Sequence, residues 1–184
     1  WDGLGYIKYY ASTRERYEEG VPDINVHIIN GEINGILTAD KTNDEMYAMC
    51  KKAATEGNIC IDVLGKRVQS IWTSAGMRDY CKASDGTSLG YRQYINLLVT
   101  WEHRQLGLEK YNRIPDNHTM AFTNYTYYMF QTTLGVSFHH NQEQRVLNCK
   151  TMMLNDNDAI WGFSHEWGHQ HQMHPYACWG GLSE

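Results

Sequence analysis

The sequence predicts an α+β fold in which a small mixed sheet precedes one last full helix. Short β-branched runs at 24–29, 59–64 and 67–73 are typical of strands. Residues 88–106 carry apolar side chains every three or four positions, as a helix with one buried face does. Near the C-terminal end, the polar run at 155–158 supplies capping residues for a further helix.

Length and composition limit the class of protein. The chain has 184 residues, of which 42% are hydrophobic and 20% are charged, as in globular proteins with a single core. Its net charge of −5 argues against a nucleic-acid-binding protein, because such proteins gather Lys and Arg. No stretch approaches the roughly 18 to 20 apolar residues that span a bilayer. We therefore expect no membrane segment.

The cysteines and the two ends of the chain add little about the fold. The five cysteines show no C-x-x-C spacing, which excludes a cysteine zinc site and a disulfide-dense small scaffold. The first residue is Trp1 with no leader after it, and the last residues before Glu184 resemble the start of an element. We therefore expect a piece of a longer protein whose export signal lies outside this sequence.

The first expected element is a strand pair. Residues 24–29 alternate in polarity and are β-branched, as a half-buried strand should be. Asn30 and Gly31 then form a typical hairpin turn, and residues 33–38 are the expected return strand.

A helix and a second strand pair follow. Thr42, with Glu45 three residues later, forms a capping box that opens the helix, and Gly57 closes it. One side of this helix is apolar and consists of Met46, Met49, Cys50 and Ala53. Residues 59–64 and 67–73 are then expected to pair as strands.

The second half of the chain is expected to be mainly helical. In this interpretation, residues 1–82 form a β/α subdomain at the start of the chain, and residues 83–184 form the helical part. The long helix covers 88–106, with Tyr91, Ile95 and Leu98 on its apolar side. Strands are expected at 119–123 and 135–139, before the final helix.

The final helix carries the sequence H-E-x-x-H, which points to a metal site. His165 and His169 are four residues apart, so both imidazoles project from one face of a helix and can reach one metal ion. Glu166 lies beside the first histidine, where its carboxylate can hold and deprotonate a metal-bound water. Zinc lowers the pKa of such a water toward about 7. The simpler alternative is a solvated helix that happens to be rich in histidine.

A catalytic zinc usually has three protein ligands, so a third is needed. The metzincin pattern would place a histidine at position 175 and a glycine at 172, where this chain has Pro175 and Gln172. The metzincin class is therefore excluded. Downstream of the second histidine the only carboxylate is Glu184, and a glutamate from a following helix is the gluzincin arrangement. Gly180 and Gly181 can bend the chain between His169 and Glu184.

This pattern resembles a known family. The run His-Glu-Trp-Gly-His-Gln-His-Gln from His165, followed by Trp-Gly-Gly-Leu-Ser-Glu up to Glu184, is similar to the enhancin-type and mucin-degrading zinc metallopeptidases (peptidase family M-sixty). Residues 26–35 and 64–68 are similar to strands that precede the catalytic helix in that family. The resemblance implies a zincin-like, gluzincin-type catalytic domain, of which the remainder should follow Glu184.

The family resemblance also implies a function. It predicts a secreted or cell-surface zinc endopeptidase that hydrolyses glycoproteins, typically mucin-like O-glycosylated chains. His165, His169 and Glu184 carry over as ligands of one zinc ion, and Glu166 carries over as the catalytic base. Weaker candidates for contacts with the substrate or the transition state are Gln172, His171, His174 and Tyr176. The pair His139-His140 ends an expected strand, where a substrate could lie along a sheet edge.

Two other functions stay open at this point. The chain could be a non-catalytic glycoprotein-binding module whose H-E-x-x-H helix holds a structural zinc or is a relic, since a structural site closes its fourth position with a protein ligand. It could also hydrolyse a bond other than a peptide bond. The presence of Glu166 favours an enzyme, because a structural site has no use for a carboxylate there.

Overall fold

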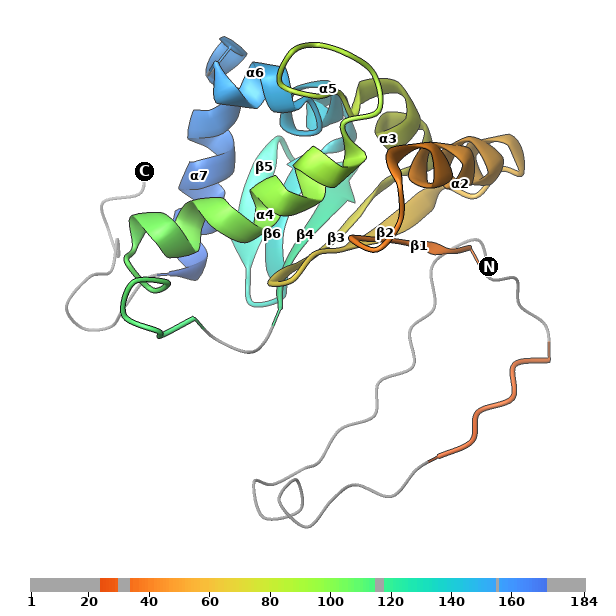
Figure 1. Cartoon of the computed structure of the whole chain (residues 1–184), viewed down its shortest axis with the longest axis horizontal. Coiled ribbons are helices and arrows are strands. Elements are labelled where there is room, and N and C mark those ends of the chain that lie inside the picture. The colour runs from red at the N-terminus through yellow and green to blue at the C-terminus, as the bar shows by residue number, and fades with distance from the viewer. Residues whose placement is uncertain (1–23, 30–33, 115–117, 155, 172–184) are drawn as a thin grey trace.

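The computed structural model describes residues 24–29, 34–114, 118–154 and 156–171. Figure 1 shows a single layer of strands with helices packed over it. In chain order the elements are β1 (Ile36–Thr38), α2 (Asn43–Thr55), β2 (Cys60–Leu64), β3 (Val68–Thr73), α3 (Ser74–Tyr80), α4 (Tyr91–Gln105), β4 (Thr119–Asn124), β5 (Met129–Thr132), β6 (Gly135–His139), η1 (His140–Gln142), α5 (Glu143–Val146), α6 (Cys149–Met153), η2 (Asp156–Asp158) and α7 (Ala159–Gln170).

The strands form one mixed sheet that takes strands from both halves of the chain. Its six strands lie in the order β1-β2-β3-β4-β6-β5. The pairs β1–β2, β3–β4 and β4–β6 are parallel, whereas β2–β3 and β5–β6 are antiparallel. Among the described strands, β1 and β5 are therefore the edges of the sheet. The predicted fold is α+β with a small mixed sheet; the structure has helices and strands together, and its sheet is mixed and has six strands.

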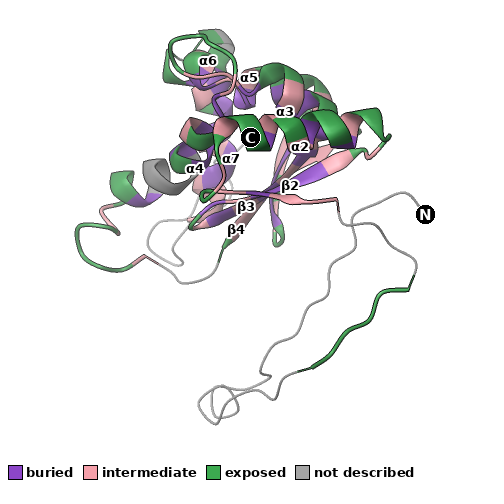
Figure 2. Cartoon of the chain, turned by 45° about the vertical axis from the view of Figure 1, so that its right-hand side comes forward, coloured by how far each residue is buried: buried purple, intermediate pink, exposed green. Residues whose placement is uncertain are grey.

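The helices provide the apolar layer that covers the sheet. Helix α4 crosses in front of the strands in Figure 1, and Figure 2 shows α2, α4 and α7 above β2, β3 and β4. The largest fully buried side chains lie between these layers and come from both strands and helices: Trp72, Tyr91, Tyr94, Phe138, Leu37, Met46, Ile61, Met77 and Ile95. Aromatic residues thus supply much of the buried volume. No described helix has the length and apolar composition that crossing a membrane requires.

Several elements form as the sequence predicts, because their signals are local. The Thr42 backbone N–H donates to Glu45 Oε2 at 2.7 Å, and the Glu45 N–H donates to Thr42 Oγ1 at 3.2 Å, which confirms the capping box. Gly57 follows the helix with φ +82°. The strand pair β2–β3 is antiparallel as expected. Strands β4 and β6 start at the predicted residues.

The first predicted strand pair is wrong. Residues 24–29 have no regular secondary structure and are exposed, with Ile29 85% exposed. Strand β1 covers only the end of the predicted return strand and pairs in parallel with β2. A β-branched run gives strand propensity, but a strand also needs a hydrogen-bonding partner, which the pattern does not supply. The expected turn at Asn30 and Gly31 lies outside the described residues.

Helix α4 begins later than predicted, whereas α7 begins directly after the predicted capping run at 155–158. Helix α4 begins at Tyr91, because Gly90 N–H donates to Cys81 O at 3.0 Å and thereby holds the preceding residues in a loop. Asp158 is the N-cap of α7, yet it has φ +56° and its side chain makes no capping hydrogen bond. The tight turn η2 leads directly into α7, and an aspartate tolerates the left-handed conformation that this requires.

One buried carboxylate joins three parts of the fold. Glu143, at the start of α5, is 2% exposed. Its Oε1 accepts the backbone N–H of Thr73 at 2.9 Å, and the hydroxyl groups of Thr73 and Thr123 also donate to this carboxylate. A side chain at Gly76 would collide with it, so α3 approaches α5 closely only because that residue is glycine. Burial raises the pKa of Glu143, and the threonine donors oppose this effect.

Candidate active site

The H-E-x-x-H residues lie on α7, and an aromatic stack fixes this helix to the core. Phe163 and Trp167 are buried at 4% and 3% exposure. The ring of Phe163 stacks on Phe138 of β6 at 5.6 Å between centroids, and on Trp167 at 5.0 Å. Each such aromatic pair adds about 0.5–1.5 kcal/mol beyond burial of area. The rotation of α7 about its axis is therefore set by its apolar face.

A second side of α7 follows the edge strand β5. A Cβ atom at Gly162 would lie 2.7 Å from Met129 Cε, so the glycine lets the first turns of the helix approach the strand. Near the other end, Gln170 Nε2 donates to Thr132 O at 2.8 Å. These contacts lie eight residues apart on the helix, about 12 Å, and three apart on the strand, about 10 Å. Helix and strand therefore run side by side in the same direction.

The two candidate ligands, His165 and His169, project from one side of α7. This side adjoins the side of the helix that faces β5. His165 and His169 are one turn apart, and their Nε2 atoms lie 3.3 Å from each other. The rings meet edge to face, with centroids 4.9 Å apart and an angle of 89° between their planes. Both side chains are partly exposed. The prediction that one helical face brings the two imidazoles together agrees with this geometry.

Glu166 lies on the buried side of this pair. It is four residues from both Gly162 and Gln170, so it falls on the line of α7 that contacts β5, and it is 7% exposed. Burial raises the pKa of the Glu166 carboxyl, while the neighbouring His165 and His169 act in the opposite direction. A desolvated carboxylate next to two imidazoles is suited to accepting a proton from a group that those imidazoles help to hold.

Trp161 shields the outer face of the first candidate ligand. Its indole stacks on His165 with centroids 4.9 Å apart and planes 23° from parallel. The indole is nevertheless 59% exposed. A tryptophan one turn before a histidine stacks on it readily, since residues four apart share a helix face. This contact restricts the rotation of the His165 ring and leaves an open aromatic surface beside the pair.

His171 belongs to a different side of the helix. Its Nδ1 lies 3.1 Å from Trp167 O, and its ring meets His103 of α4 edge-on with centroids 5.6 Å apart. At about 100° per residue this position is far from the ligand line. Burial lowers the pKa of His103, and the nearby His171 and Arg67 add to that effect. The structure does not bring His171 to the two candidate ligands.

The remaining candidate residues lie outside the part of the chain that the structure describes. These are Gln172, His174, Tyr176 and Glu184, so the predicted third ligand has no described position. Within residues 24–29, 34–114, 118–154 and 156–171, no three His, Cys, Asp or Glu side chains are grouped to hold a metal ion.

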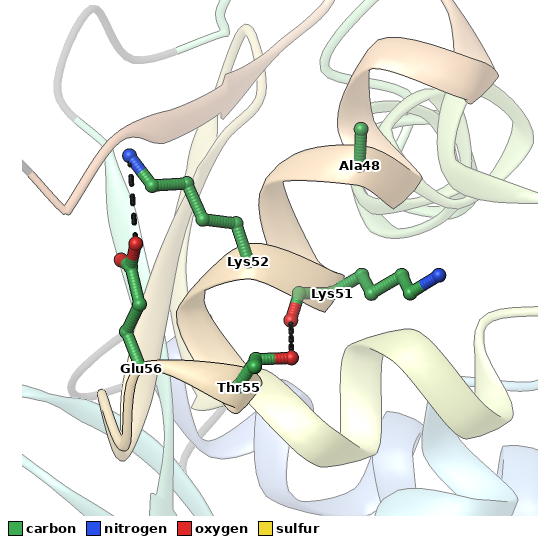
Figure 3. Close-up of a pocket in the computed structure, with 5 residues that line it drawn as sticks. All are labelled: Ala48, Lys51, Lys52, Thr55 and Glu56. Carbon is green, nitrogen blue, oxygen red and sulfur yellow. Dashed lines mark hydrogen bonds and ion pairs between the residues drawn. The ribbon is translucent and has the colours of Figure 1, made fainter.

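A surface hollow on α2 is not part of this site. It has a volume of about 310 Å³ and is lined by Ala48, Lys51, Lys52, Thr55 and Glu56, all from or next to one exposed helix. Figure 3 shows their polar groups bonded within the helix, with Thr55 Oγ1 donating to Lys51 O and Lys52 paired with Glu56. Helix α2 and α7 lie at opposite ends of the molecule in Figure 1.

The sequence interpretation missed the residues that orient α7 on the sheet. It suggested that a substrate could lie at a sheet edge near His139 and His140, although an exposed strand end was the simpler interpretation of that pair. His139 ends β6, which is an interior strand, whereas β5 is an edge among the described strands. Strand β5 has only four residues, too few for its pattern to be distinctive. The sequence assigned no role to Gln170, and only the tertiary structure shows its bond to Thr132.

Comparison with known proteins shows a likeness of fold. No protein-family model matches the sequence, and no curated protein matches it. Among solved structures, a metallopeptidase from Bacteroides thetaiotaomicron has a TM-score of 0.62 and 19% identity, over 80% of this chain and 24% of that chain. A metallopeptidase in complex with Tn antigen has a TM-score of 0.61 and 21% identity, over 77% of this chain and 26% of the other.

A third solved structure shows a more distant likeness. The catalytic module of the metalloprotease ZmpA from Clostridium perfringens has a TM-score of 0.53 and 10% identity, over 73% of this chain and 28% of that module's chain. This chain therefore spans about a quarter of the length of the structures to which it is similar. Its mixed α/β fold is similar to part of a metallopeptidase structure.

Proposed function

We propose that this chain is the part of a zinc-dependent endopeptidase that carries the H-E-x-x-H helix, and that the enzyme acts on glycoproteins. The observation that carries the proposal is the 3.3 Å separation of His165 Nε2 and His169 Nε2 beside the buried Glu166. A helix that only happens to be rich in histidine would have no reason to bury a carboxylate next to two converging imidazoles.

The two imidazoles fit a tetrahedral zinc ion. Two nitrogens that are each about 2.0–2.1 Å from one tetrahedral zinc lie about 3.3 Å apart, which is the distance between the two Nε2 atoms. Imidazole nitrogen is also a ligand type that zinc accepts well. In this proposal His165, His169 and Glu184 hold the ion. When bound there, zinc supplies Lewis-acid polarisation and makes water a nucleophile near neutral pH.

Glu166 has the position and environment of the general base. Its burial next to His165 and His169 supports the proposal that it contacts a water molecule positioned by those side chains. Its burial raises the pKa of the carboxyl, which makes the carboxylate a stronger proton acceptor than an exposed glutamate. In the proposed reaction Glu166 takes the proton from the attacking water and delivers it to the leaving amine.

The edge strand gives the substrate a place to lie. Strand β5 pairs with β6 on one side only among the described strands, and its length runs beside α7. An extended peptide can add to such an edge through main-chain hydrogen bonds, with alternate side chains available for recognition. A peptide placed along β5 would pass next to the face of α7 that bears His165 and His169.

The substrate class rests on the family resemblance and on one comparison. The metallopeptidase in complex with Tn antigen shares the fold of this chain. We infer that the substrate here is likewise a glycoprotein, mucin-like and O-glycosylated, and that the enzyme is secreted or exposed at the cell surface. The full-length enzyme should then cut an O-glycosylated protein faster than its deglycosylated form. Equal or faster cleavage of the deglycosylated chain would contradict this substrate class.

Metal analysis combined with cleavage assays tests the peptidase proposal. In the full-length protein, His165→Ala and His169→Ala should each abolish the binding of about one zinc ion. Glu166→Gln should keep the zinc and lower the rate of hydrolysis by about 10² to 10⁴. His118→Ala is the matched control, because its ring contacts Gly65 O rather than α7. Zinc bound without any hydrolysis by the wild type would instead support a binding module.

A further inference from the structure

Trp161 and His165 form a stacked pair of rings on α7. The indole and the imidazole lie 4.9 Å apart between centroids, with planes 23° from parallel. The two residues are four positions apart on one helix, a spacing that puts side chains next to each other. Trp161 lies in the first turn of α7 and is 59% exposed. Burial in the core therefore does not determine the position of this indole, and the ring that it contacts belongs to the first candidate ligand.

The helix itself is held in place by other residues. Phe163 and Trp167 are buried and stack on each other in the core. Gln170 donates to Thr132 O at 2.8 Å. With the backbone fixed in this way, the imidazole of His165 changes direction by rotating about its two side-chain bonds. A flat ring that lies on the indole resists these rotations, because turning it out of plane breaks the near-parallel contact.

The direction that the stack selects brings the two candidate ligands together. His165 Nε2 lies 3.3 Å from His169 Nε2, and the planes of the two rings meet at 89°. A rotation of the His165 ring away from the indole would carry its Nε2 away from this partner. Because the ring is already ordered, a cation that binds to the pair does not have to restrict it, which would otherwise weaken the affinity.

The indole also favours the charge that His165 acquires as a ligand. An imidazole that donates an electron pair to a divalent cation becomes partly positive. The face of an aromatic ring is negative, and among aromatic side chains tryptophan attracts cations most strongly. The stacked indole therefore stabilises the metal-bound form of His165 more than the metal-free form. Groups that orient and polarise a ligating histidine typically change metal affinity by about 10- to 100-fold.

Two other roles for Trp161 agree less well with the geometry. A residue that fixes α7 to the core would be buried, as Phe163 and Trp167 are, whereas Trp161 is 59% exposed. An indole that served only as a surface for a ligand would not need one of its faces to lie on a histidine, whereas Trp161 covers His165. The near-parallel contact with a candidate ligand is the arrangement that orienting this ligand requires.

We propose that Trp161 is a positioning residue of the metal site. Its indole holds the His165 imidazole in the direction that pairs the Nε2 atoms of His165 and His169, and it thereby raises the affinity of this pair for a divalent cation. The proposal rests on the proposed function, because it concerns two of the zinc ligands assigned there. Trp161 acts through His165 and takes no part in the proton transfers assigned to Glu166.

The affinity of the full-length enzyme for zinc, measured by competition with a chromophoric chelator, tests this role. Trp161→Ala should raise the dissociation constant for zinc about tenfold. Trp161→Phe keeps a flat ring with a weaker face and should raise it about threefold or less. Trp161→Leu keeps an apolar side chain of good helix propensity without an aromatic face, and it should behave like Trp161→Ala. Tyr111→Ala is the matched control, because it removes a ring that is 68% exposed and lies beside Lys110.

Nuclear magnetic resonance of the metal-free enzyme tests the stack directly. With histidine labelled selectively with carbon-13, the signal of His165 can be assigned by its loss in His165→Ala. The ring current of the indole should shift the ring protons of His165 upfield, because the two rings are stacked. This shift should disappear in Trp161→Ala and be retained in part in Trp161→Phe. A change in stability alone would not produce this pattern.

Three results would overturn the proposal. An unchanged dissociation constant for zinc in Trp161→Ala would show that the stack does not support the ligand. A wild-type signal of His165 without an upfield shift would show that the ring is not held on the indole. A higher KM in Trp161→Ala with an unchanged dissociation constant for zinc would show that Trp161 contacts the substrate instead.

Cu²⁺ separates a failure of this proposal from a failure of the proposed function. Imidazole sites bind Cu²⁺ more strongly than zinc, so two histidines one helical turn apart can bind this ion without the third ligand. If the wild type binds Cu²⁺ through His165 and His169 but binds no zinc or cleaves nothing, the proposed function fails. The dissociation constants of the Trp161 variants for Cu²⁺ then decide the positioning role, which a rise supports and an unchanged value overturns. If the wild type binds neither ion, both proposals fail.

Discussion

Glu143 should make the stability of the protein depend on pH, and Glu143→Gln should remove that dependence. The carboxyl is 2% exposed, and burial raises its pKa above the ordinary value of 4.5. Between the unfolded and the folded pKa, the folded state therefore binds more protons than the unfolded state. Stability contributed by this group is complete below about pH 4.5 and is lost as pH rises through the folded pKa.

The size of the effect follows from the linkage between protons and folding. One group that binds a proton only in the folded state changes the free energy of unfolding by at most about 1.4 kcal/mol per pH unit. Glutamine has a similar shape and still presents an oxygen to the Thr73 N–H and the Thr123 hydroxyl, but it does not ionise. The free energy of unfolding of Glu143→Gln minus that of the wild type should therefore rise between pH 4 and pH 7.

Urea-induced unfolding followed by circular dichroism at several pH values measures this difference. Every other titrating group is common to both proteins, so the difference isolates Glu143. Glu109→Gln is the control, since Glu109 is exposed and its surface ion pair with Arg104 contributes about 0–1 kcal/mol. A difference that stays flat, or that falls as pH rises, would refute the argument. It would mean that the threonine donors outweigh the loss of solvation.

Four further substitutions test the fold that supports the site. Phe163→Ala removes the ring between β6 and α7 and should lower the free energy of unfolding by about 3–5 kcal/mol, measured by urea unfolding. Gly135→Ala should prevent folding, because its φ is +148° and a Cβ would collide with Met120 O; near-native circular dichroism would contradict this. Gly168→Ala meets no atom within 4 Å and should raise the melting temperature slightly through helix propensity. Thr42→Ala breaks the capping box and should cost about 1 kcal/mol.

The parts of the fold that could be predicted depend on neighbours in the sequence. Thr42 and Glu45 satisfy each other within one turn, so their pattern sufficed to place α2. The strand pair β2–β3 is joined by a short turn and could be recognised in the same way. The parallel pairing of β4 with β6 could not, because β5 lies between them in the sequence and no local pattern records which strands become neighbours.

The same difference between local and distant contacts applies to the candidate site. That His165, Glu166 and His169 lie together could be predicted because the helical repeat alone places them so. The contacts of Gln170 beside the site, and of Glu143 in the fold that supports it, could not be predicted, since their partners are 38 and 70 residues away in the chain. The exposed segment at 24–29 shows the opposite error, in which a strong local pattern predicted a strand that has no partner among the described residues.

The parallel pairing of β3 with β4 has a consequence for how the chain folds. Residues 74–118, which are 45 residues, connect these two strands, whereas residues 65–67, three residues, connect β2 with β3. Closing the longer loop costs about 2.4 kcal/mol more in chain entropy. We therefore expect the hairpins β2–β3 and β5–β6 to form early and to join late through β3 and β4. An insertion within the connection between α4 and β4 should slow this joining step while leaving each hairpin intact.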